Sequence, residues 1–247
     1  MKKILFSLFL FCLTLNAVTL NIAVAANVSY AIEELKVKFI ELHPDIDINI
    51  ILGSSGKLTA QISHGAPYGL FMSANMLYPS KLYESQLAIT RPKVYAKGTL
   101  ALFSAKKRDF SLGMKLLKTK DIQKIALANP KTAPYGKAAF ETLQTSKIYT
   151  DIKTKLIFAE SISQTLSYII TAADIGFIAS SSLYSAKMSH YKKGTHWLEL
   201  DPNLYSPIKQ GVVLLSFGQD TQAYRLFYEF LFTIDAQKIF KKYGYII

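Results

Sequence analysis

The 247-residue sequence is nearly devoid of cysteine, with Cys12 as the single example. One cysteine cannot form a disulfide within the chain, and it cannot build a metal site from several thiolates. Histidine is also scarce: the four residues include no pair spaced i, i+4 on an expected helix, so a zinc hydrolase of the HExxH type has no support. The sequence therefore directs attention away from thiol, disulfide and zinc chemistry.

Long apolar runs are rare too. The one that stands out covers residues 4–15, after Lys2 and Lys3 and before the small residue Ala17. It is too short to span a bilayer and is typical of a secretory signal peptide. We expect residues 1–17 to be removed as a signal peptide and the mature protein to be periplasmic. Cys12 could instead carry a lipid, but the bulky residues 9–11 before it argue against that reading.

Acidic residues are few, 17 against 29 lysines and arginines, and the chain without Lys2 and Lys3 would have a net charge of +10. Such an excess favours anionic partners without identifying one. The basic residues are scattered, with short clusters such as residues 106–108, and no arginine-rich helix or ribonucleoprotein motif accompanies them. We therefore expect a solvated basic surface and no nucleic-acid partner.

Apolar periodicity alternates between strand and helix along the chain. Expected strands are 20–24, 45–52, 70–73, 94–96, 100–103, 125–128, 155–158, 175–178 and 212–216, and expected helices are 29–42, a short one after Gly56, 137–143, 163–171, 221–232 and 236–243. Repeated βα winding predicts an α/β fold. We expect two lobes, each a mainly parallel sheet flanked by helices, formed by residues 18–96 plus 208–247 and by residues 97–207. A ligand cleft would lie between them.

Four of the expected junctions between strand and helix are rich in small or polar residues, namely residues 27–29, 53–56, 129–136 and 161–164. The start of a helix offers backbone N–H groups that have no partner within the helix, and these bind anions without a charged side chain. Each junction alone could be an ordinary cap, with Ser54 or Ser55 as the capping residue. Four such junctions facing one cleft would form an oxyanion site.

Several strings in the chain, taken together, resemble the periplasmic molybdate-binding proteins of ABC transporters, which have the type II solute-binding fold. The resemblance runs from Leu20 to Ile246. It rests on Ala25-Ala26-Asn27, on Gly53-Ser54-Ser55-Gly56 with Gln61 and Gly65-Ala66-Pro67, on Asn129-Pro130 and Ala133 to Ala138, and on Ile239-Phe240 with Tyr243-Gly244-Tyr245.

This resemblance implies a two-lobed protein that holds molybdate or tungstate with neutral hydroxyl, amide and backbone N–H groups. The family's binding positions fall on Asn27, with the N–H of Ala26 beside it, on Ser55, on the backbone of Tyr135 and on the N–H of Ile162. The metal is inside the oxyanion, so no residue is expected to ligate a cation. No cofactor is implied, and the implied partners are a membrane permease and its ATPase, with the binding protein as a monomer.

Three positions depart from the family pattern: Gly69 and Asn75, where aspartate is usual, and Ala179. Many members carry a ligand tyrosine at the strand end that matches Ala179, so the phenol of Tyr135 is the candidate replacement. Two alternatives stay open at this point. The ligand could be another tetrahedral oxyanion such as sulfate, or Ser54 and Lys57 could form the S-x-x-K pair of a serine acyl hydrolase. The partner motifs S-D-N and K-T-G are missing, so we expect a binding protein and not an enzyme.

Overall fold

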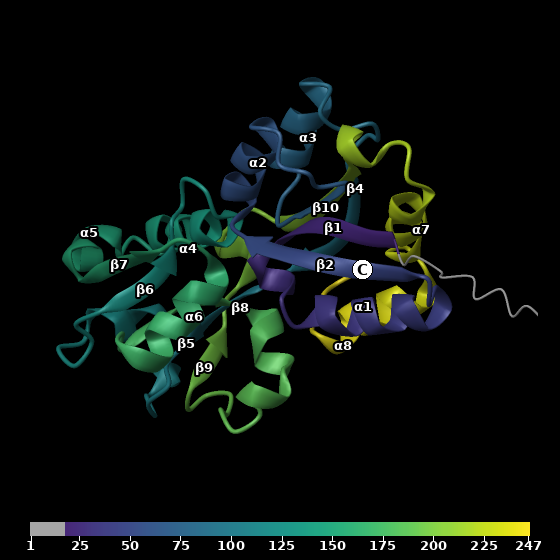
Figure 1. Cartoon of the computed structure of the whole chain (residues 1–247). Coiled ribbons are helices and arrows are strands. Elements are labelled where there is room, and N and C mark those ends of the chain that lie inside the picture. The colour runs from purple at the N-terminus through teal and green to yellow at the C-terminus, as the bar shows by residue number, and fades with distance from the viewer. Residues whose placement is uncertain (1–17) are drawn as a thin grey trace, which may run out of the picture.

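The computed structural model describes residues 18–247. The predicted signal peptide, with Cys12, lies outside the described residues. Two five-stranded sheets flanked by helices form two lobes that lie side by side, as Figure 1 shows. The predicted two-lobed α/β fold is thus confirmed. Within residues 18–247, no helix is both long enough and apolar enough to cross a membrane.

The first lobe contains both the beginning and the end of the described chain. Its strands lie in the order β2-β1-β3-β10-β4. They are β1 (Val18–Ala25), β2 (Ile46–Gly53), β3 (Leu70–Ser73), β4 (Lys93–Gly98) and β10 (Ile208–Leu214). Its helices are α1 (Ala31–Leu42), α2 (Ser55–Ser63), α3 (Leu77–Glu84), α7 (Gln222–Phe230) and α8 (Ile234–Lys242).

The second lobe is built from the middle of the chain, with strand order β7-β6-β8-β5-β9. Its strands are β5 (Leu100–Phe103), β6 (Ile125–Ala128), β7 (Leu156–Ala159), β8 (Ile175–Ala179) and β9 (Trp197–Glu199). Its helices are α4 (Pro134–Thr145), α5 (Tyr149–Ile152) and α6 (Ile162–Thr171). A 3₁₀ segment, Ser180–Tyr184, follows β8.

Each sheet is mixed, because two of its four strand pairings are parallel and two are antiparallel. The antiparallel strands are those next to the crossings between the lobes. The chain passes from β4 straight into β5 through Thr99 and returns through residues 205–207 into β10. No crossover helix precedes β5 or β10, so neither strand is forced to be parallel to its neighbours. The predicted lobe boundaries at 96 and 208 stay a prediction; β4 extends to Gly98.

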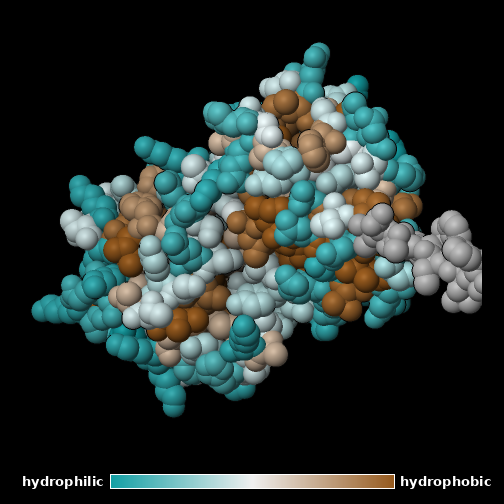
Figure 2. Space-filling view, viewed as in Figure 1, coloured by the Kyte–Doolittle hydropathy of each residue, from teal (hydrophilic) through white to brown (hydrophobic). Residues whose placement is uncertain are grey.

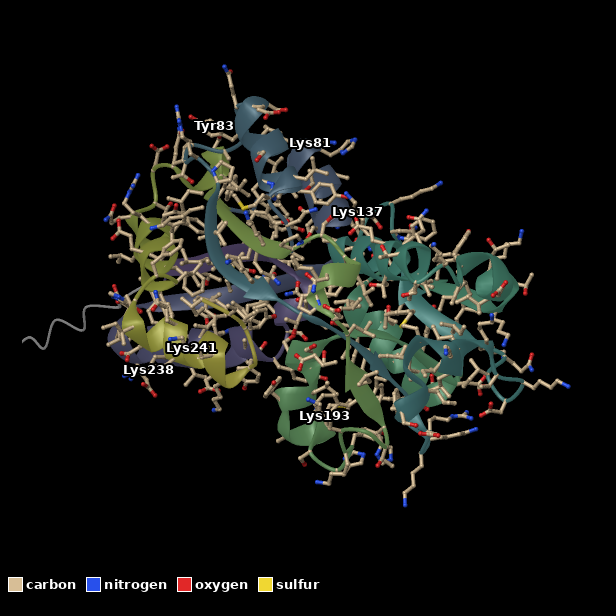
Figure 3. All side chains as sticks on the ribbon, turned by 180° about the vertical axis from the view of Figure 1, so that it is seen from behind. Lys81, Tyr83, Lys137, Lys193, Lys238 and Lys241 are labelled. Carbon is tan, nitrogen blue, oxygen red and sulfur yellow. The ribbon has the colours of Figure 1, made fainter. Side chains whose placement is uncertain are left out.

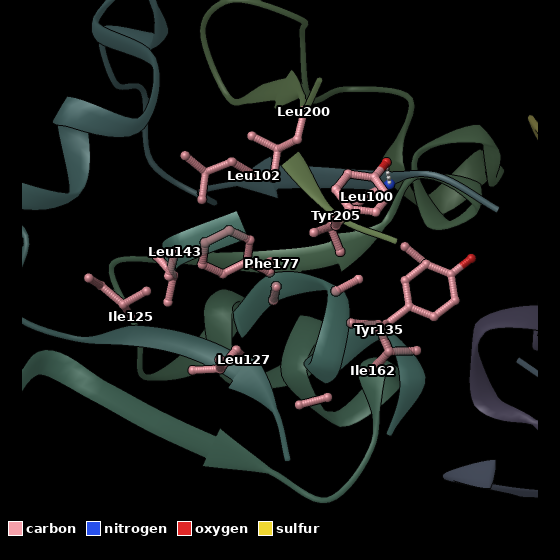
Figure 4. Close-up of a cluster of buried hydrophobic side chains, with 14 of the residues drawn as sticks. Leu100, Leu102, Ile125, Leu127, Tyr135, Leu143, Ile162, Phe177, Leu200 and Tyr205 are labelled. Carbon is pink, nitrogen blue, oxygen red and sulfur yellow. Dashed lines mark hydrogen bonds between the residues drawn. The ribbon is translucent and has the colours of Figure 1, made fainter. Parts of the chain in front are cut away.

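Separate apolar cores hold the helices onto the two sheets. In the first lobe, α1 buries Ile32, Leu35 and Phe39 at helical spacing, and Phe39 packs edge-on against Phe227 of α7. In the second lobe, Figure 4 shows Leu100, Phe177 and their neighbours filling the space between the sheet and α4. Each lobe thus has apolar packing of its own, and the second-lobe cluster also reaches Ala25, Ala26 and Ala74 of the first lobe.

The surface is mostly hydrophilic. Figure 2 shows hydrophilic residues over much of one face, with apolar patches between them. In Figure 3 the labelled lysines, Lys81, Lys137, Lys193, Lys238 and Lys241, are spread over both lobes. This distribution agrees with the scattered basic surface that the sequence predicts.

Candidate functional site

A narrow cavity of about 10 Å³ lies between the lobes and brings the five predicted site residues together. These are Ala26 and Asn27 after β1, Ser55 at the start of α2, Tyr135 at the start of α4 and Ile162 at the start of α6. The rest of its wall is Ala25, Gly53, Ser54, Ala74, Ala133 and Pro134. None of these lining residues is charged, so any anion there would meet neutral groups.

The beginnings of three helices supply the backbone of this wall. Helix α2 begins at Ser55, α4 at Pro134 and α6 at Ile162. N–H groups in the first turn of a helix have no acceptor within that helix, and the helix dipole makes this end partly positive. Pro134 has no N–H, so Tyr135 holds the first donor of α4. Both lobes therefore present backbone donors and positive helix ends to one cavity.

Tight packing fixes the start of α4. A Cβ built on Gly136 would lie 2.2 Å from the carbonyl oxygen of Ala128, at the end of β6. Only glycine allows the helix to approach the strand this closely. The Pro-Tyr-Gly sequence thus sets where the N–H of Tyr135 lies relative to the sheet.

Ser55 keeps a free hydroxyl hydrogen. The N–H of Ala74 donates to Ser55 Oγ at 2.9 Å, so this oxygen is used as an acceptor and its own hydrogen can be donated elsewhere. The side chain is 1% exposed. Ser55 is therefore suited to donate to a ligand from both its hydroxyl and its backbone N–H.

Asn27 is placed differently from its expected use as a side-chain donor. Its Nδ2 donates to Gln210 Oε1 at 2.9 Å and to Tyr245 Oη at 3.0 Å, and neither of these residues lines the cavity. Its carbonyl oxygen accepts from Tyr245 Oη at 2.8 Å and from Ser181 Oγ at 3.0 Å. Its Oδ1 is buried and has no hydrogen-bond partner among residues 18–247. In this arrangement both amide hydrogens are used behind the cavity.

The phenol of Tyr135 also faces this polar network. Gln210 Nε2 donates to Tyr135 Oη at 3.1 Å. Figure 4 shows the hydroxyl of Tyr135 pointing away from Phe177 and the core of the second lobe. A Cβ on Gly98 would lie 1.9 Å from this oxygen, so glycine at that position leaves room for the phenol. Tyr135 thus offers its backbone at the helix start while its hydroxyl contacts Gln210.

Burial keeps the phenols of the network protonated. It raises the pKa of Tyr135 and of Tyr95 well above the usual range, and it raises the pKa of Tyr245 to about 12. The physical cause in each case is loss of hydration of the charged form. The three hydroxyls are therefore neutral donors at ordinary pH.

Direct contacts join the lobes around the cavity. Gly56 N donates to Thr132 O at 2.9 Å, and Ser163 Oγ donates to Ala26 O at 2.7 Å. On the outside, Lys57 Nζ lies 2.6 Å from Glu160 Oε1. Tight contact on several sides encloses the site and limits its size.

The pair proposed for a hydrolase is not brought together. Lys57 forms its ion pair with Glu160, and Ser54 Oγ is buried without a hydrogen-bond partner in the described part of the chain. A serine nucleophile needs a base within hydrogen-bond reach. The described residues also include no cluster of three or more His, Cys, Asp or Glu side chains that could hold a metal ion.

The sequence analysis missed Gln210 and Tyr245 as members of the polar network. Gln210 is fully buried in β10 and is followed by Gly211 and four apolar residues. A lone amide in an apolar strand is the signal that could have identified it, because a buried polar group needs partners. Tyr245 lies near the C-terminus, and its position in the sequence does not indicate that it contacts Asn27.

Comparisons with known proteins agree with the two-lobed fold. Residues 20–246 match the family of bacterial extracellular solute-binding proteins. The chain is 36% identical to the molybdate-binding protein of Rhodobacter capsulatus over 226 residues, covering 91% of this chain and 86% of the relative.

Two solved structures are also similar. One is the periplasmic molybdate-binding protein of Azotobacter vinelandii, with a TM-score of 0.85 and 30% identity, covering 92% of this chain and 99% of that one. The other is the substrate-binding domain of a putative molybdenum ABC transporter from Clostridium difficile, with a TM-score of 0.67 and 30% identity, covering 93% and 98%. The match thus extends over nearly all the described chain.

Proposed function

Because the chain belongs to the bacterial extracellular solute-binding proteins, we propose that it captures molybdate and delivers it to an ABC importer. It is a binding protein of a transport system and not an enzyme. The observation that carries the proposal is the uncharged cavity between the lobes, where three helices begin. The names of the two relatives that bind molybdate support the choice of ligand.

The donors suit a dianion. We assign ligand contacts to the N–H groups of Ala26, Ser55, Tyr135 and Ile162, to the Ser55 hydroxyl, and to the amide of Asn27 in the orientation described below. Hydrogen bonds to a charged group contribute about 1.5–3 kcal/mol each. The summed free energy of about six such hydrogen bonds exceeds the free-energy cost of association, about 4–15 kcal/mol, when the donors are held in place before binding. Helix starts anchored to sheets meet that condition.

A wall rich in donors and without a carboxylate also selects among anions. Molybdate, tungstate and sulfate carry no proton at neutral pH, whereas phosphate keeps one or two and needs an acceptor for each. No carboxylate lines the cavity, so phosphate would be disfavoured. Sulfate has shorter bonds to oxygen and would contact fewer of the donors if these are placed to meet the oxygens of molybdate. Tungstate has nearly the shape of molybdate, and we propose that both bind.

The proposed route includes export and docking. We propose that residues 1–17 direct secretion and are removed, that the protein acts in the periplasm as a monomer without a cofactor, and that it delivers the anion to a membrane permease driven by an ATPase. We also propose that residues 97–207 move as one lobe against residues 18–96 and 208–247. The two crossings near Thr99 and residues 205–207 would be the hinge.

Isothermal titration calorimetry tests the ligand. Protein lacking residues 1–17 would be titrated with molybdate, tungstate, sulfate and phosphate at one pH and one salt concentration. We expect one-to-one binding of molybdate and tungstate, and no heat above dilution from sulfate or phosphate. Binding of sulfate alone would move the proposal to the sulfate alternative, and silence toward all four anions would contradict it.

A further inference from the structure

A buried polar network lies directly behind the cavity and is centred on Gln210. This side chain is 0% exposed and comes from β10. Its Oε1 accepts from Asn27 Nδ2 at 2.9 Å and from Tyr95 Oη at 3.3 Å, and its Nε2 donates to Tyr135 Oη at 3.1 Å. One amide thus links a cavity residue of the first lobe with a cavity residue of the second.

One atom of the network is left without a partner. Asn27 Oδ1 is buried and accepts no hydrogen bond from residues 18–247, although Asn27 lines the cavity and is 3% exposed. Leaving a buried acceptor unpaired costs about 1–3 kcal/mol. Because Nδ2 is held by Gln210 and Tyr245, Oδ1 is the amide atom left for the cavity. An oxygen there would repel an oxyanion.

We propose that Gln210 is a positioning residue that controls which amide atom Asn27 presents to the ligand. The two carboxamides turn over as a pair, so that Asn27 directs its Nδ2 at a bound oxyanion while its Oδ1 accepts from Gln210 Nε2. This inference rests on the proposed function, since it assumes an oxyanion in the cavity.

The turned network keeps partners for both amides if the Tyr245 hydroxyl turns from the Asn27 carbonyl to donate to Asn27 Oδ1, while the carbonyl still accepts from Ser181 Oγ. The oxygen and nitrogen of a carboxamide occupy equivalent places, so a half-turn exchanges them without moving other atoms far. Gln210 Nε2 would then donate to Asn27 Oδ1 and to Tyr95 Oη. Gln210 Oε1 would accept from Tyr135 Oη, which reverses the present direction of that bond. The hydroxyls of Tyr95, Tyr135 and Tyr245 can each accept or donate, so they permit both states.

The consequence is selectivity between anions with and without a proton. With Nδ2 at the cavity, Asn27 adds a donor for a fully deprotonated oxyanion. With Oδ1 there, it offers an acceptor that suits protonated phosphate. Gln210 acts on this choice through Asn27 without touching the ligand, because it does not line the cavity.

A double-substitution cycle tests the proposal. Gln210→Met keeps the length of the side chain but can neither donate nor accept at the amide position. We expect it to weaken molybdate binding by about tenfold, the loss expected for one hydrogen bond to a charged group, and to let phosphate compete with molybdate at a lower phosphate concentration than in the unaltered protein. In an Asn27→Ala background, the same change should cost less than about twofold. Gln61→Met, on α2 and outside the cavity wall, is the matched control.

Two outcomes separate the claims. If the unaltered protein binds molybdate but Gln210→Met costs the same factor with and without Asn27, or leaves competition by phosphate unchanged, the positioning role is wrong. If the unaltered protein does not bind molybdate, the proposed function fails instead. Urea denaturation of each variant without ligand measures folding. Gln210→Leu, which can neither donate nor accept, replaces Gln210→Met if the latter does not fold, and it should give the same dependence on Asn27.

Discussion

The two lobes contribute to the cavity in different ways. The first lobe brings side chains with their own polar groups, the Ser55 hydroxyl and the Asn27 amide. The second brings the starts of α4 and α6, where Tyr135 and Ile162 offer backbone N–H groups. A side-chain donor is lost with one substitution, whereas a backbone donor survives any substitution that leaves the helix start in place. The proposed site should therefore be sensitive to residue type on one side and tolerant on the other.

The network around Gln210 is the exception, because it joins both lobes through side chains. Its tyrosines come from β4 (Tyr95), α4 (Tyr135) and the C-terminal segment (Tyr245). Its effect on the site is therefore expected to depend on these side chains staying neutral and in contact.

The largest expected effect is alkaline loss of stability through this network. The pKa values of Tyr95, Tyr135 and Tyr245 are raised by burial, that of Tyr245 to about 12, while an unfolded tyrosine titrates near 10. The folded state keeps these phenols protonated to higher pH than the unfolded state does, so the tyrosines make their full contribution to the free energy of unfolding below pH 10. It falls by about 1.4 kcal/mol per pH unit for each tyrosine above that.

Urea denaturation between pH 8 and pH 11.5 measures this loss. Tyr245→Phe removes one titrating group and should make the decline shallower by about 1.4 kcal/mol per pH unit. An equally steep decline in Tyr245→Phe would mean that this phenol is not held neutral by burial.

The next largest effect is the loss of a side-chain donor from the first lobe. Ser55→Ala should weaken molybdate binding by about 1–3 kcal/mol, because it removes a hydroxyl donor and leaves the helix start in place. Ser63→Ala, at the exposed end of the same helix, is the matched control. Calorimetric titration compares them, and equal affinities would remove Ser55 from the site.

A smaller effect is expected from the ion pair that joins the lobes. Lys57 and Glu160 are each about half exposed, so their attraction is worth only about 0–1 kcal/mol. Lys57→Gln should speed ligand release by up to about fivefold at low salt, and less at high salt because the pair is screened. Stopped-flow dissociation measures the rate. Lys38→Gln breaks a pair with Glu41 within the first lobe and should not change it.

The smallest effect on affinity should follow Ile162→Val. The N–H of this residue is the proposed donor, and a shorter side chain leaves it in place. We expect less than about a twofold change in molybdate affinity, with a loss of about 0.5–1.5 kcal/mol in folding stability. Calorimetric titration of the variant measures its molybdate affinity, and urea denaturation of the same variant measures its folding stability. A loss of affinity as large as that of Ser55→Ala would contradict the assignment of Ile162 as a backbone donor.

Local pattern predicted most of the fold. The strands at 70–73 and 125–128 match β3 and β6 in full, because a four-residue apolar run between turn signals is long enough for a strand and too short for a typical helix. Helix α3 was not predicted. Its Pro79 lies in the first turn, where proline is tolerated but weakens the pattern. The antiparallel direction of β5 and β10 was also missed, because strand direction depends on chain connections that periodicity does not report.

The residues of the site and its polar network also fall into those that the sequence predicted and those that only the fold reveals. Local signals predicted the polar junctions that hold Ser55, Tyr135 and Ile162, the family resemblance selected these residues, and the structure brings them to one cavity. Gln210 and Tyr245 lie 183 and 218 residues from Asn27 in sequence. Their contact depends on the return of β10 and the C-terminal segment to the first lobe, which only the assembled fold displays.

The most direct test is to locate the molybdenum of the bound oxyanion in crystals of the protein. Crystals grown with molybdate and measured at the molybdenum absorption edge would give one anomalous peak for each bound ion. We predict a single peak per chain in the cavity, within hydrogen-bonding reach of Ser55 and the N–H groups of Tyr135 and Ile162 through the oxyanion's oxygens. A peak elsewhere, with this cavity empty, would contradict the account.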